Sequence, residues 1–338
     1  MREAGCPKRG LYIMGFTNYP NGITSFGNPV YGDGLFLGAG KVRYLVDSKT
    51  SSDAYWSLMY ERNVPDGDIY TSFSTCYSAM TNNRNDVIVM YPMNEVVGAT
   101  TWANSNSHLM GASPPAFGYN PCYFTHTSDQ DVWWTVSGSN NTFSNIRFQH
   151  GGSSTTNAHC IELTGSQNRF YNCHFDGPET TEEAGVAGYD LVKISNEYNY
   201  FEKCLFGNPW NAHTDMSALL GFTGNKNCTS FFKDCTFQKN FGAVGCLYIH
   251  TYQSLNGGCH IQFDNCTFQN TGTTTGTYAI DGYGLNTNNA MMTFNNCCFS
   301  GVTDIVASTY EAYVWFSNNA VYAANDQQNG LAANPNVS

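Results

Sequence analysis

The sequence predicts an all-β fold, a single right-handed parallel β-helix whose coils repeat every 31 residues. The first observation is a phrase, Phe-x-x-Cys-x-Phe, that occurs five times with this spacing between its leading Phe residues. The second is that Asn, Gly, Thr and Ser flank each phrase and favour turns, while another short apolar run precedes it. Apolar residues at i, i+3, i+4 and i+7 are missing from the repeats, so stacked helices are not expected.

The repeated phrase specifies which side chains form the interior. Its Cys and second Phe are two residues apart and share one face of a strand, whereas its first Phe is out of phase with them. A bend must therefore lie between them, and we place it at the residue before Cys, which is Asn172, Lys203, Asp234, Asn265 or Asn296. Asn and Asp are the residues other than Gly that best tolerate the left-handed backbone conformation. The expected inward ladder consists of Phe170, Cys173, Phe175, Phe201, Cys204, Phe206, Phe232, Cys235, Phe237, Phe263, Cys266, Phe268, Phe294, Cys297 and Phe299.

Composition and charge restrict the class of protein. Charged residues make up only 12% of the 338 residues and 15% are aromatic, which suits a turn-rich β protein with a core rather than a disordered chain. The net charge is −11 and no Arg follows Arg169, so we expect no nucleic-acid-binding face. No apolar stretch is long enough to span a membrane, and the first residues lack the apolar core of a secretion signal.

The 13 Cys residues are expected to be buried free thiols. Strands of adjacent coils lie about 4.8 Å apart, which would permit disulfides, but the total is odd and five Cys repeat at an inward position. Free Cys is commonly buried, and nothing in the sequence indicates an oxidising compartment. A metal site is not favoured, because no paired C-x-x-C motif occurs. We therefore expect no metal and no other cofactor.

The chain divides into three expected parts. Residues 1–40 are rich in Gly and Pro with little periodicity and form an N-terminal arm or irregular cap; residues 41–322 form the β-helix; residues 323–338 form a tail. The one helical pattern lies at 72–81, where a short amphipathic helix would plug the open end of the solenoid and cover its unpaired strands. The clearest predicted strands near this end are 42–46, 87–91 and 132–136.

Several segments of the N-terminal half carry a family resemblance. They are Gly40-Lys-Val-Arg-Tyr-Leu-Val-Asp47-Ser, the helix at 72–81, Asn85-Asp-Val-Ile-Val89 with Pro92, Thr101-Trp-Ala and His108-Leu-Met-Gly-Ala-Ser113. This part of the chain resembles β-helix proteins encoded by tailed bacteriophages, which are similar in fold to pectate lyases and are mostly structural parts of virions. The resemblance spans about residues 40–320, and it implies the fold but carries over no catalytic residue.

Catalysis was weighed against a structural role. Glycosidases need two carboxylates about 5–9.5 Å apart. The chain has no Asp-Asp and no Gly-His-Gly motif of the kind that polygalacturonases share, and His213-Thr-Asp215 is the nearest remnant. We expect the densest acidic stretch to be a solvated loop. The alternative is a carboxylate pair or cation site, with Asp176 and Glu179 as first candidates. The acidic stretch comprises Asp176, Glu179, Glu182, Glu183 and Asp190.

Histidines and tryptophans were the remaining candidates. The histidines are expected to be polar wall residues rather than bases, and they are His150, His174, His213 and His250. The tryptophans can line either a sugar-binding face or a subunit interface. They are Trp133, Trp134, Trp210 and Trp315.

These observations favour a non-enzymatic virion structural protein, first of all a capsid decoration or cement protein. We expect it to be made in the host cytoplasm, to reside in the virion and to contact the major capsid protein or other virion proteins. A homotrimer is expected, because such solenoids commonly align side by side around an axis. One alternative is a tail spike or fibre that binds or depolymerises a host glycan. The other is a secreted polysaccharide lyase or hydrolase. Either would require the acidic loop to lie opposite an aromatic groove.

Overall fold

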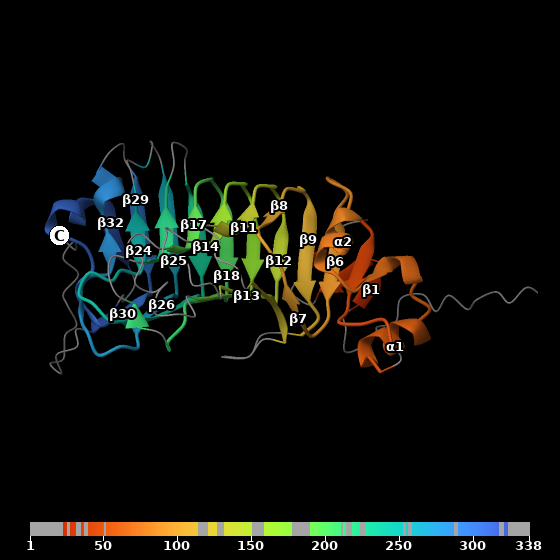
Figure 1. Ribbon diagram of the computed structural model, residues 1–338. Helices are drawn as coiled ribbons and strands as arrows, with labels where there is room; N and C mark the ends of the chain where they lie inside the picture. The colour runs from red at the N-terminus through yellow and green to blue at the C-terminus, as the bar shows by residue number, and fades with distance from the viewer. Residues whose placement is uncertain are drawn as a thin grey trace, which may run out of the picture.

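The coils stack along one axis, so the molecule is elongated, with its N-terminal end on the right of Figure 1 and its C-terminal end on the left. In this computed structural model, long sheets of parallel strands join each coil to the next, which confirms the parallel β-helix. The structure describes residues 23–25, 28–31, 35–36, 40–50, 52–113, 121–126, 132–150, 159–177, 190–210, 212–213, 218–223, 228–252, 255, 259–286, 290–317 and 321–323.

Three sheets form the walls of the β-helix. The eleven-stranded sheet contains β4 (Val42–Leu45), β5 (Ile69–Tyr70), β6 (Asp86–Met90), β9 (Ser107–Gly111), β12 (Thr142–Ser144), β15 (Arg169–Tyr171), β18 (Asn199–Glu202), β22 (Ser230–Lys233), β25 (His260–Asp264), β29 (Met291–Asn295) and β32 (Val314–Ser317). The ten-stranded sheet contains β7 (Met93–Val96), β10 (Cys122–Thr125), β13 (Arg147–Gln149), β16 (His174–Asp176), β19 (Leu205–Phe206), β20 (Ala212–His213), β23 (Thr236–Phe241), β26 (Thr267–Asn270), β30 (Cys298–Ser300) and β33 (Val321–Ala323). The seven-stranded sheet contains β8 (Thr100–Trp102), β11 (Val132–Val136), β14 (His159–Leu163), β17 (Asp190–Ile194), β21 (Ala218–Phe222), β24 (Ile249–Thr251) and β28 (Ile280–Asp281).

Smaller elements complete the described part of the chain. Residues 1–40 include a three-stranded antiparallel sheet rather than only irregular chain, made of β1 (Ile23–Ser25), β2 (Asn28–Tyr31) and β3 (Leu35–Phe36). Strands β27 (Gly276–Tyr278) and β31 (Val302–Asp304) pair with each other. The helices are α1 (Ala54–Glu61), α2 (Phe73–Ser78) and the 3-10 segments η1 (Asp66–Asp68), η2 (Tyr283–Asn286) and η3 (Ser308–Tyr313). No helix in these described segments is long and apolar enough to cross a membrane. The tail beyond 323 lies outside the described residues.

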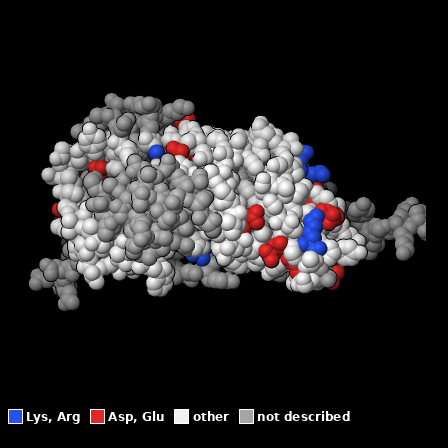
Figure 2. All heavy atoms as spheres, in the orientation of Figure 1, with Lys and Arg blue, Asp and Glu red and all other residues white. Residues whose placement is uncertain are grey.

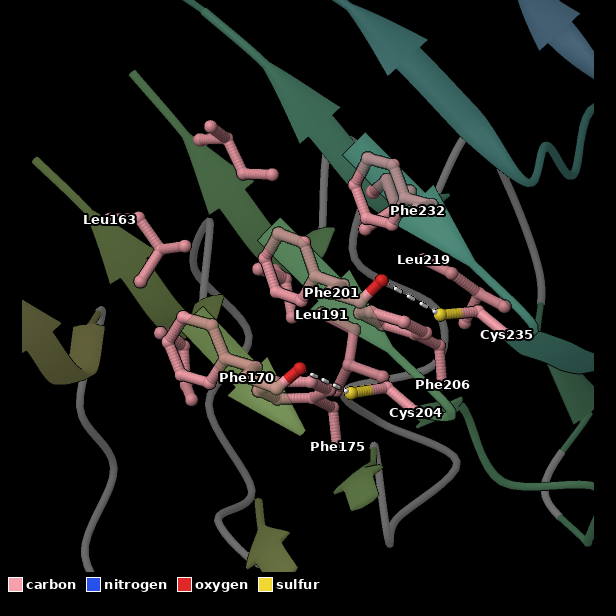
Figure 3. Close-up of a cluster of buried hydrophobic side chains, with 14 of the residues drawn as sticks. Leu163, Phe170, Phe175, Leu191, Phe201, Cys204, Phe206, Leu219, Phe232 and Cys235 are labelled. Atoms are coloured by element: carbon pink, nitrogen blue, oxygen red, sulfur yellow. Dashed lines mark hydrogen bonds between the residues drawn. The ribbon is translucent and has the colours of Figure 1, made fainter. Parts of the chain in front are cut away.

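Stacked phenylalanine rings fill the interior (Figure 3). All fifteen ladder residues expected from the sequence are at most 2% exposed. The register pairs each leading Phe with the next, and the rings of Phe201 and Phe232 stack with centroids 4.7 Å apart. In the second column the rings of Phe206 and Phe237 stack at 4.6 Å. Each stack repeats from coil to coil because the side chains at these positions are the same, so the interior is one continuous aromatic column.

The ladder cysteines lie beside these rings as free thiols. The Sγ of Cys204 lies 3.4 Å from the carbonyl oxygen of Phe170, and that of Cys235 lies 3.6 Å from the carbonyl oxygen of Phe201 (Figure 3). These contacts give the weak S–H donors a partner inside an apolar core. Burial raises the pKa of the Cys173 and Cys235 thiols. The thiols therefore act as small apolar spacers between aromatic columns.

The bend before each ladder Cys has the left-handed backbone conformation. The φ angles of Asn172, Lys203, Asp234, Asn265 and Asn296 lie between 51° and 54°, which confirms the expected bend. The side-chain amide of Asn265 donates to Asp234 Oδ1 at 2.6 Å, and that of Asn296 donates to Asn265 Oδ1 at 2.9 Å. The bends therefore form an outer polar column that keeps successive coils in register.

Helix α2 closes the N-terminal end of the core. Phe73 and Cys76 are buried and belong to the main core cluster. The Phe73 ring lies 5.0 Å from the Phe124 ring and 5.2 Å from the Trp134 ring. Apolar side chains from one face of this short helix thus cover the first coils, as the pattern at 72–81 led us to expect.

Helix α1 corrects the expectation that 72–81 is the only helical segment. Asp53 caps it, because its Oδ1 accepts the backbone N–H groups of Tyr55 at 2.8 Å and Trp56 at 2.9 Å. Only Met59 of this helix is fully buried, in a second cluster that includes Val89. The apolar stripe is too weak to reveal the helix by periodicity, and the N-cap carries the signal instead.

A buried carboxylate holds the first strands of the eleven-stranded sheet together. Asp86 accepts hydrogen bonds from Arg43 at 2.8 Å and from Arg84 at 2.6 Å, and from the backbone N–H groups of Lys41 and Thr81 at 2.8 Å. Although burial acts in the opposite direction, these bonds lower the pKa of Asp86 to about 2. The carboxylate is thus ionised and fully partnered.

Candidate functional site

The outward face of the seven-stranded sheet carries a row of ionisable side chains. The strand register aligns one outward residue from each coil, so Glu162 lies beside Lys193 and His250 lies beside Asp281. Gly221 occupies the position between Lys193 and His250. Neighbouring positions in such a row are about 4.8 Å apart. The row therefore places two opposite pairs of ionisable groups on either side of a residue without a side chain.

Direct contacts connect these groups. Lys193 Nζ lies 3.7 Å from Glu162 Oε1 and 3.3 Å from Nε2 of His159. His250 Nε2 lies 3.2 Å from Asp281 Oδ2, and its Nδ1 lies 3.9 Å from Asp190 Oδ1. One imidazole thus stands between two carboxyl groups, one of them partly exposed and the other buried.

Asp190 is the buried member of this cluster. It is 0% exposed, at the first position of β17. Its carboxyl group occupies the space above Gly221, since a Cβ built on that glycine would come within 1.9 Å of Asp190 Oδ2. Neither carboxyl oxygen accepts a well-formed hydrogen bond from the described residues. Any side chain at 221 would therefore displace the carboxyl group.

The surroundings of Asp190 shift its protonation. Burial raises the pKa of Asp190 to about 7, although the hydroxyl of Tyr252 and the charges of His250 and Lys193 act in the opposite direction. The Tyr252 ring lies 4.0 Å from the His250 ring, and burial together with Asp190 raises the pKa of Tyr252. A carboxyl group that exchanges its proton near neutral pH is suited to general acid–base chemistry.

The geometry fits an acid–base pair better than a metal site. The carboxyl oxygens of Asp190 and Asp281 contact opposite nitrogens of His250, so they are at most roughly 9 Å apart, within the separation that inverting glycosidases use. Glu162 lies four strands from Asp281, roughly 19 Å along the row, and is too distant to serve as its partner. Within the described ranges, no three His, Cys, Asp or Glu side chains come together as a metal-binding group.

The acidic stretch does not form the site that the sequence suggested. Asp176 ends β16, is buried and forms an ion pair with Arg147, whose Nε lies 2.8 Å from Asp176 Oδ2. Glu179, Glu182 and Glu183 lie outside the described residues. Asp190, the last residue of this stretch, belongs instead to the cluster with His250.

The histidine and tryptophan candidates also separate. His150 and His174 are buried at the ten-stranded sheet, and nothing is described of the His213 side chain. Trp133 and Trp134 are 0% exposed, which corrects the idea that they line an outer face. Their strand departs from simple alternation, so both rings enter the core, where their centroids lie 5.9 Å apart.

Two exposed tryptophans remain, but they do not share a face with His250. Trp210 is 81% exposed in the loop after β19, and Trp315 is 53% exposed on β32 of the eleven-stranded sheet. Much of the face shown in Figure 2 is uncharged, and its Lys, Arg, Asp and Glu atoms gather toward the N-terminal end. The described aromatics thus do not build the acidic-loop and aromatic-groove arrangement that we expected of an enzyme.

Sequence signals for the site were present but indirect. Glu162 and Lys193 are 31 residues apart, as are His250 and Asp281. The repeat period therefore places each pair side by side on neighbouring strands. Asp190 has no such signal, because its position over Gly221 depends on coils of different length.

Known proteins resemble this chain in structure only. No protein-family model and no curated protein matches it. A deglycosylated pectin methylesterase from Aspergillus niger is similar with a TM-score of 0.54 and 13% identity, over 88% of this chain and 92% of that one. A pectin methylesterase in complex with a hexasaccharide gives 0.56 and 11%, over 87% and 92%. Pectin methylesterase PemA from Erwinia chrysanthemi gives 0.53 and 12%, over 79% and 82%. At these identities the likeness shows the right-handed parallel β-helix fold.

The comparisons contradict the expectation of a non-enzymatic virion protein with a capsid decoration role. The matching structures are those of carbohydrate-active enzymes, and a bacteriophage origin is not shown. The glycan-processing alternative is therefore better supported than the structural reading. The error has a physical cause: the repeat specifies the interior, and enzymes and structural proteins can share one interior.

Proposed function

We propose that this chain is a glycan-processing enzyme that hydrolyses a polysaccharide at the outward face of the seven-stranded sheet. The observation that carries the proposal is the His250 imidazole between the carboxyl groups of Asp281 and Asp190, with the pKa of Asp190 raised to about 7. Fold likeness to pectin methylesterases agrees with a glycan substrate but does not identify one.

Each group has a role in the hydrolysis. Asp281 takes a proton from the attacking water, whose oxygen bonds to the anomeric carbon. His250 gives a proton to the glycosidic oxygen as its bond to that carbon breaks. Asp190 then returns a proton to His250, and the proton held by Asp281 restores the relay when the products leave. The raised pKa of Asp190 keeps it protonated up to neutral pH.

The second candidate is hydrolysis of a methyl ester on an acidic glycan. The observation that favours it is that the matching structures are named pectin methylesterases. The two reactions give different products, since one releases reducing sugar ends and the other releases methanol. A tail spike acting on a host glycan and a secreted polysaccharide enzyme are both forms of this function, and they differ in the polysaccharide that they cleave.

The test is an activity screen with matched variants. Purified protein is incubated with pectin, polygalacturonate, alginate and bacterial capsule, and reducing ends and methanol are measured. Asp190→Asn, His250→Gln and Asp281→Asn should each reduce the rate at least about a hundredfold. Gln262→Ala, on the outward face of the eleven-stranded sheet, should leave it unchanged. Equal turnover by wild type and all three site variants would refute the assignment of these residues.

A further inference from the structure

A second hollow lies at the N-terminal end of the β-helix, between α2 and the strands β7 and β8. Its volume is about 380 Å³, within the range of about 300–1,000 Å³ typical of ligand pockets. Hydroxyl groups line both of its sides: Ser72, Ser74 and Ser78 at α2, and Thr100 and Thr101 at β8. Hydroxyls both donate and accept hydrogen bonds, so this lining suits a ligand that carries hydroxyls itself.

One carboxyl group is the only charged side chain in the lining, which contains no Lys, Arg or His. Glu95 is half-buried, and its Oε1 accepts the backbone N–H of Phe73 at 2.7 Å. That bond fixes the carboxyl group at the wall. Its second oxygen has no hydrogen bond to any described residue. A fixed carboxylate without a neighbouring cation attracts hydroxyl donors and disfavours anions.

Apolar surface completes the hollow. Val96, which is 57% exposed, lines it next to Glu95. Tyr77 also lines it, and its hydroxyl oxygen accepts the backbone N–H groups of Ala103 at 2.7 Å and Asn104 at 3.0 Å. Because these bonds hold the ring in place, the apolar wall is formed before any ligand arrives.

We propose that this hollow, lined by Glu95, Tyr77, Val96 and the hydroxyls of α2 and β8, binds a neutral hexose unit of a glycan. The hydroxyls and Glu95 bond to the sugar hydroxyls, and the C–H face of the sugar packs on Val96 and Tyr77. The site is separate from His250. Thr101 and His250 belong to the same outward row but lie five strands apart, roughly 24 Å. Binding here therefore requires no chemistry at Asp190, and it goes beyond the proposed hydrolysis.

The experiment measures binding of single sugars to the full chain by calorimetry or saturation-transfer NMR. Galactose and glucose are the probes, and galacturonate is the anionic counterpart. Neutral sugars should bind and galacturonate should bind more weakly. Glu95→Gln keeps an acceptor for the Phe73 N–H, so the wall stays folded, but it should weaken galactose or glucose binding at least about tenfold. The matched control is Glu61→Gln, an exposed residue of α1.

Three results would overturn the proposal: no neutral sugar binds, galacturonate binds as tightly as galactose, or Glu95→Gln binds like the wild type. The outcome is independent of the proposed hydrolysis. Asp190→Asn should lose turnover and retain sugar binding. A protein without any hydrolytic activity that binds galactose through Glu95 would support the hollow and refute only the hydrolysis.

Discussion

Replacing Asp190 by Asn should make the stability of the protein less dependent on pH between about 4 and 7. The folded protein binds a proton at Asp190 more tightly than the unfolded chain does, because burial raises the pKa from 3.8 to about 7. The stabilising contribution of this proton is complete below pH 4 and is lost as the pH rises to 7. Above pH 7 the loss is constant. Asn is similar in shape and does not ionise in this range.

The magnitude follows from the pKa difference. A shift of about three units, at about 1.36 kcal/mol each, corresponds to roughly 4 kcal/mol of stability lost by the wild type. The variant lacks this loss. The difference in unfolding free energy between Asp190→Asn and wild type should therefore rise by roughly 4 kcal/mol in favour of the variant between pH 4 and pH 7.5.

Urea unfolding of both proteins at closely spaced pH values measures this difference directly. Subtracting one curve from the other removes the contributions of groups that both proteins share, such as Asp86. Asp304→Asn is the matched control, since Asp304 is exposed on β31, and its curve should follow the wild type. Parallel curves for Asp190→Asn and wild type would show that Asp190 ionises as an ordinary surface carboxyl, and the proton relay would lose its basis.

Three further predictions concern the core, the N-terminal strands and the reaction. Phe237→Ala should lower the unfolding free energy by about 3–5 kcal/mol, against a much smaller loss for the half-exposed Phe231→Ala, and similar losses in urea would contradict the ladder. Asp86→Asn should cost about 3–5 kcal/mol at pH 7 because it leaves Arg43 buried without its charge partner. The pKa of Asp86 is lowered to about 2, so this cost should shrink as the pH falls below 4; a cost that is constant from pH 7 to pH 2 would exclude the ion pair as its source. The wild-type value of kcat/KM should fall as the pH rises through about 7 because Asp190 loses its proton there, and a flat profile from pH 5 to pH 9 would argue against its role.

The interior could be predicted from the sequence because it repeats. The ladder from Phe170 to Phe299 recurs at a fixed period, and a parallel β-helix is the arrangement that stacks identical residues. The bends were predictable for a related reason, since Asn and Asp tolerate the left-handed conformation of Asn172 and Asp234. Lys203 has the same φ although its residue type does not favour it. Neighbouring coils therefore impose this conformation where local preference is weak.

Other features depend on contacts that periodicity does not encode. Trp133 and Trp134 are adjacent in sequence, so alternation would expose one of them, yet both are buried where β11 is distorted. Helix α1 has few buried residues and was missed. The acidic stretch suggested Asp176 because its carboxylates are close in sequence, but the structure gives Asp176 an arginine partner. Asp190 meets His250 only through the stacking of coils.

The contrast between the two sides of the seven-stranded sheet explains why fold and function had to be read separately. On the inward side, Ile161, Val192 and Leu220 align as similar apolar residues, because each coil must pack on the next. On the outward side no such constraint acts, and the aligned residues change at every step, from Lys193 to Gly221 to His250. A row without repetition is not needed to hold coils together. Its most unusual member is Gly221, whose missing side chain leaves the space that the Asp190 carboxyl group occupies. Gly221→Ala should therefore displace this carboxyl group and abolish the hydrolysis while the aromatic ladder stays intact. An active Gly221→Ala protein would mean that the position of Asp190 does not matter to the reaction.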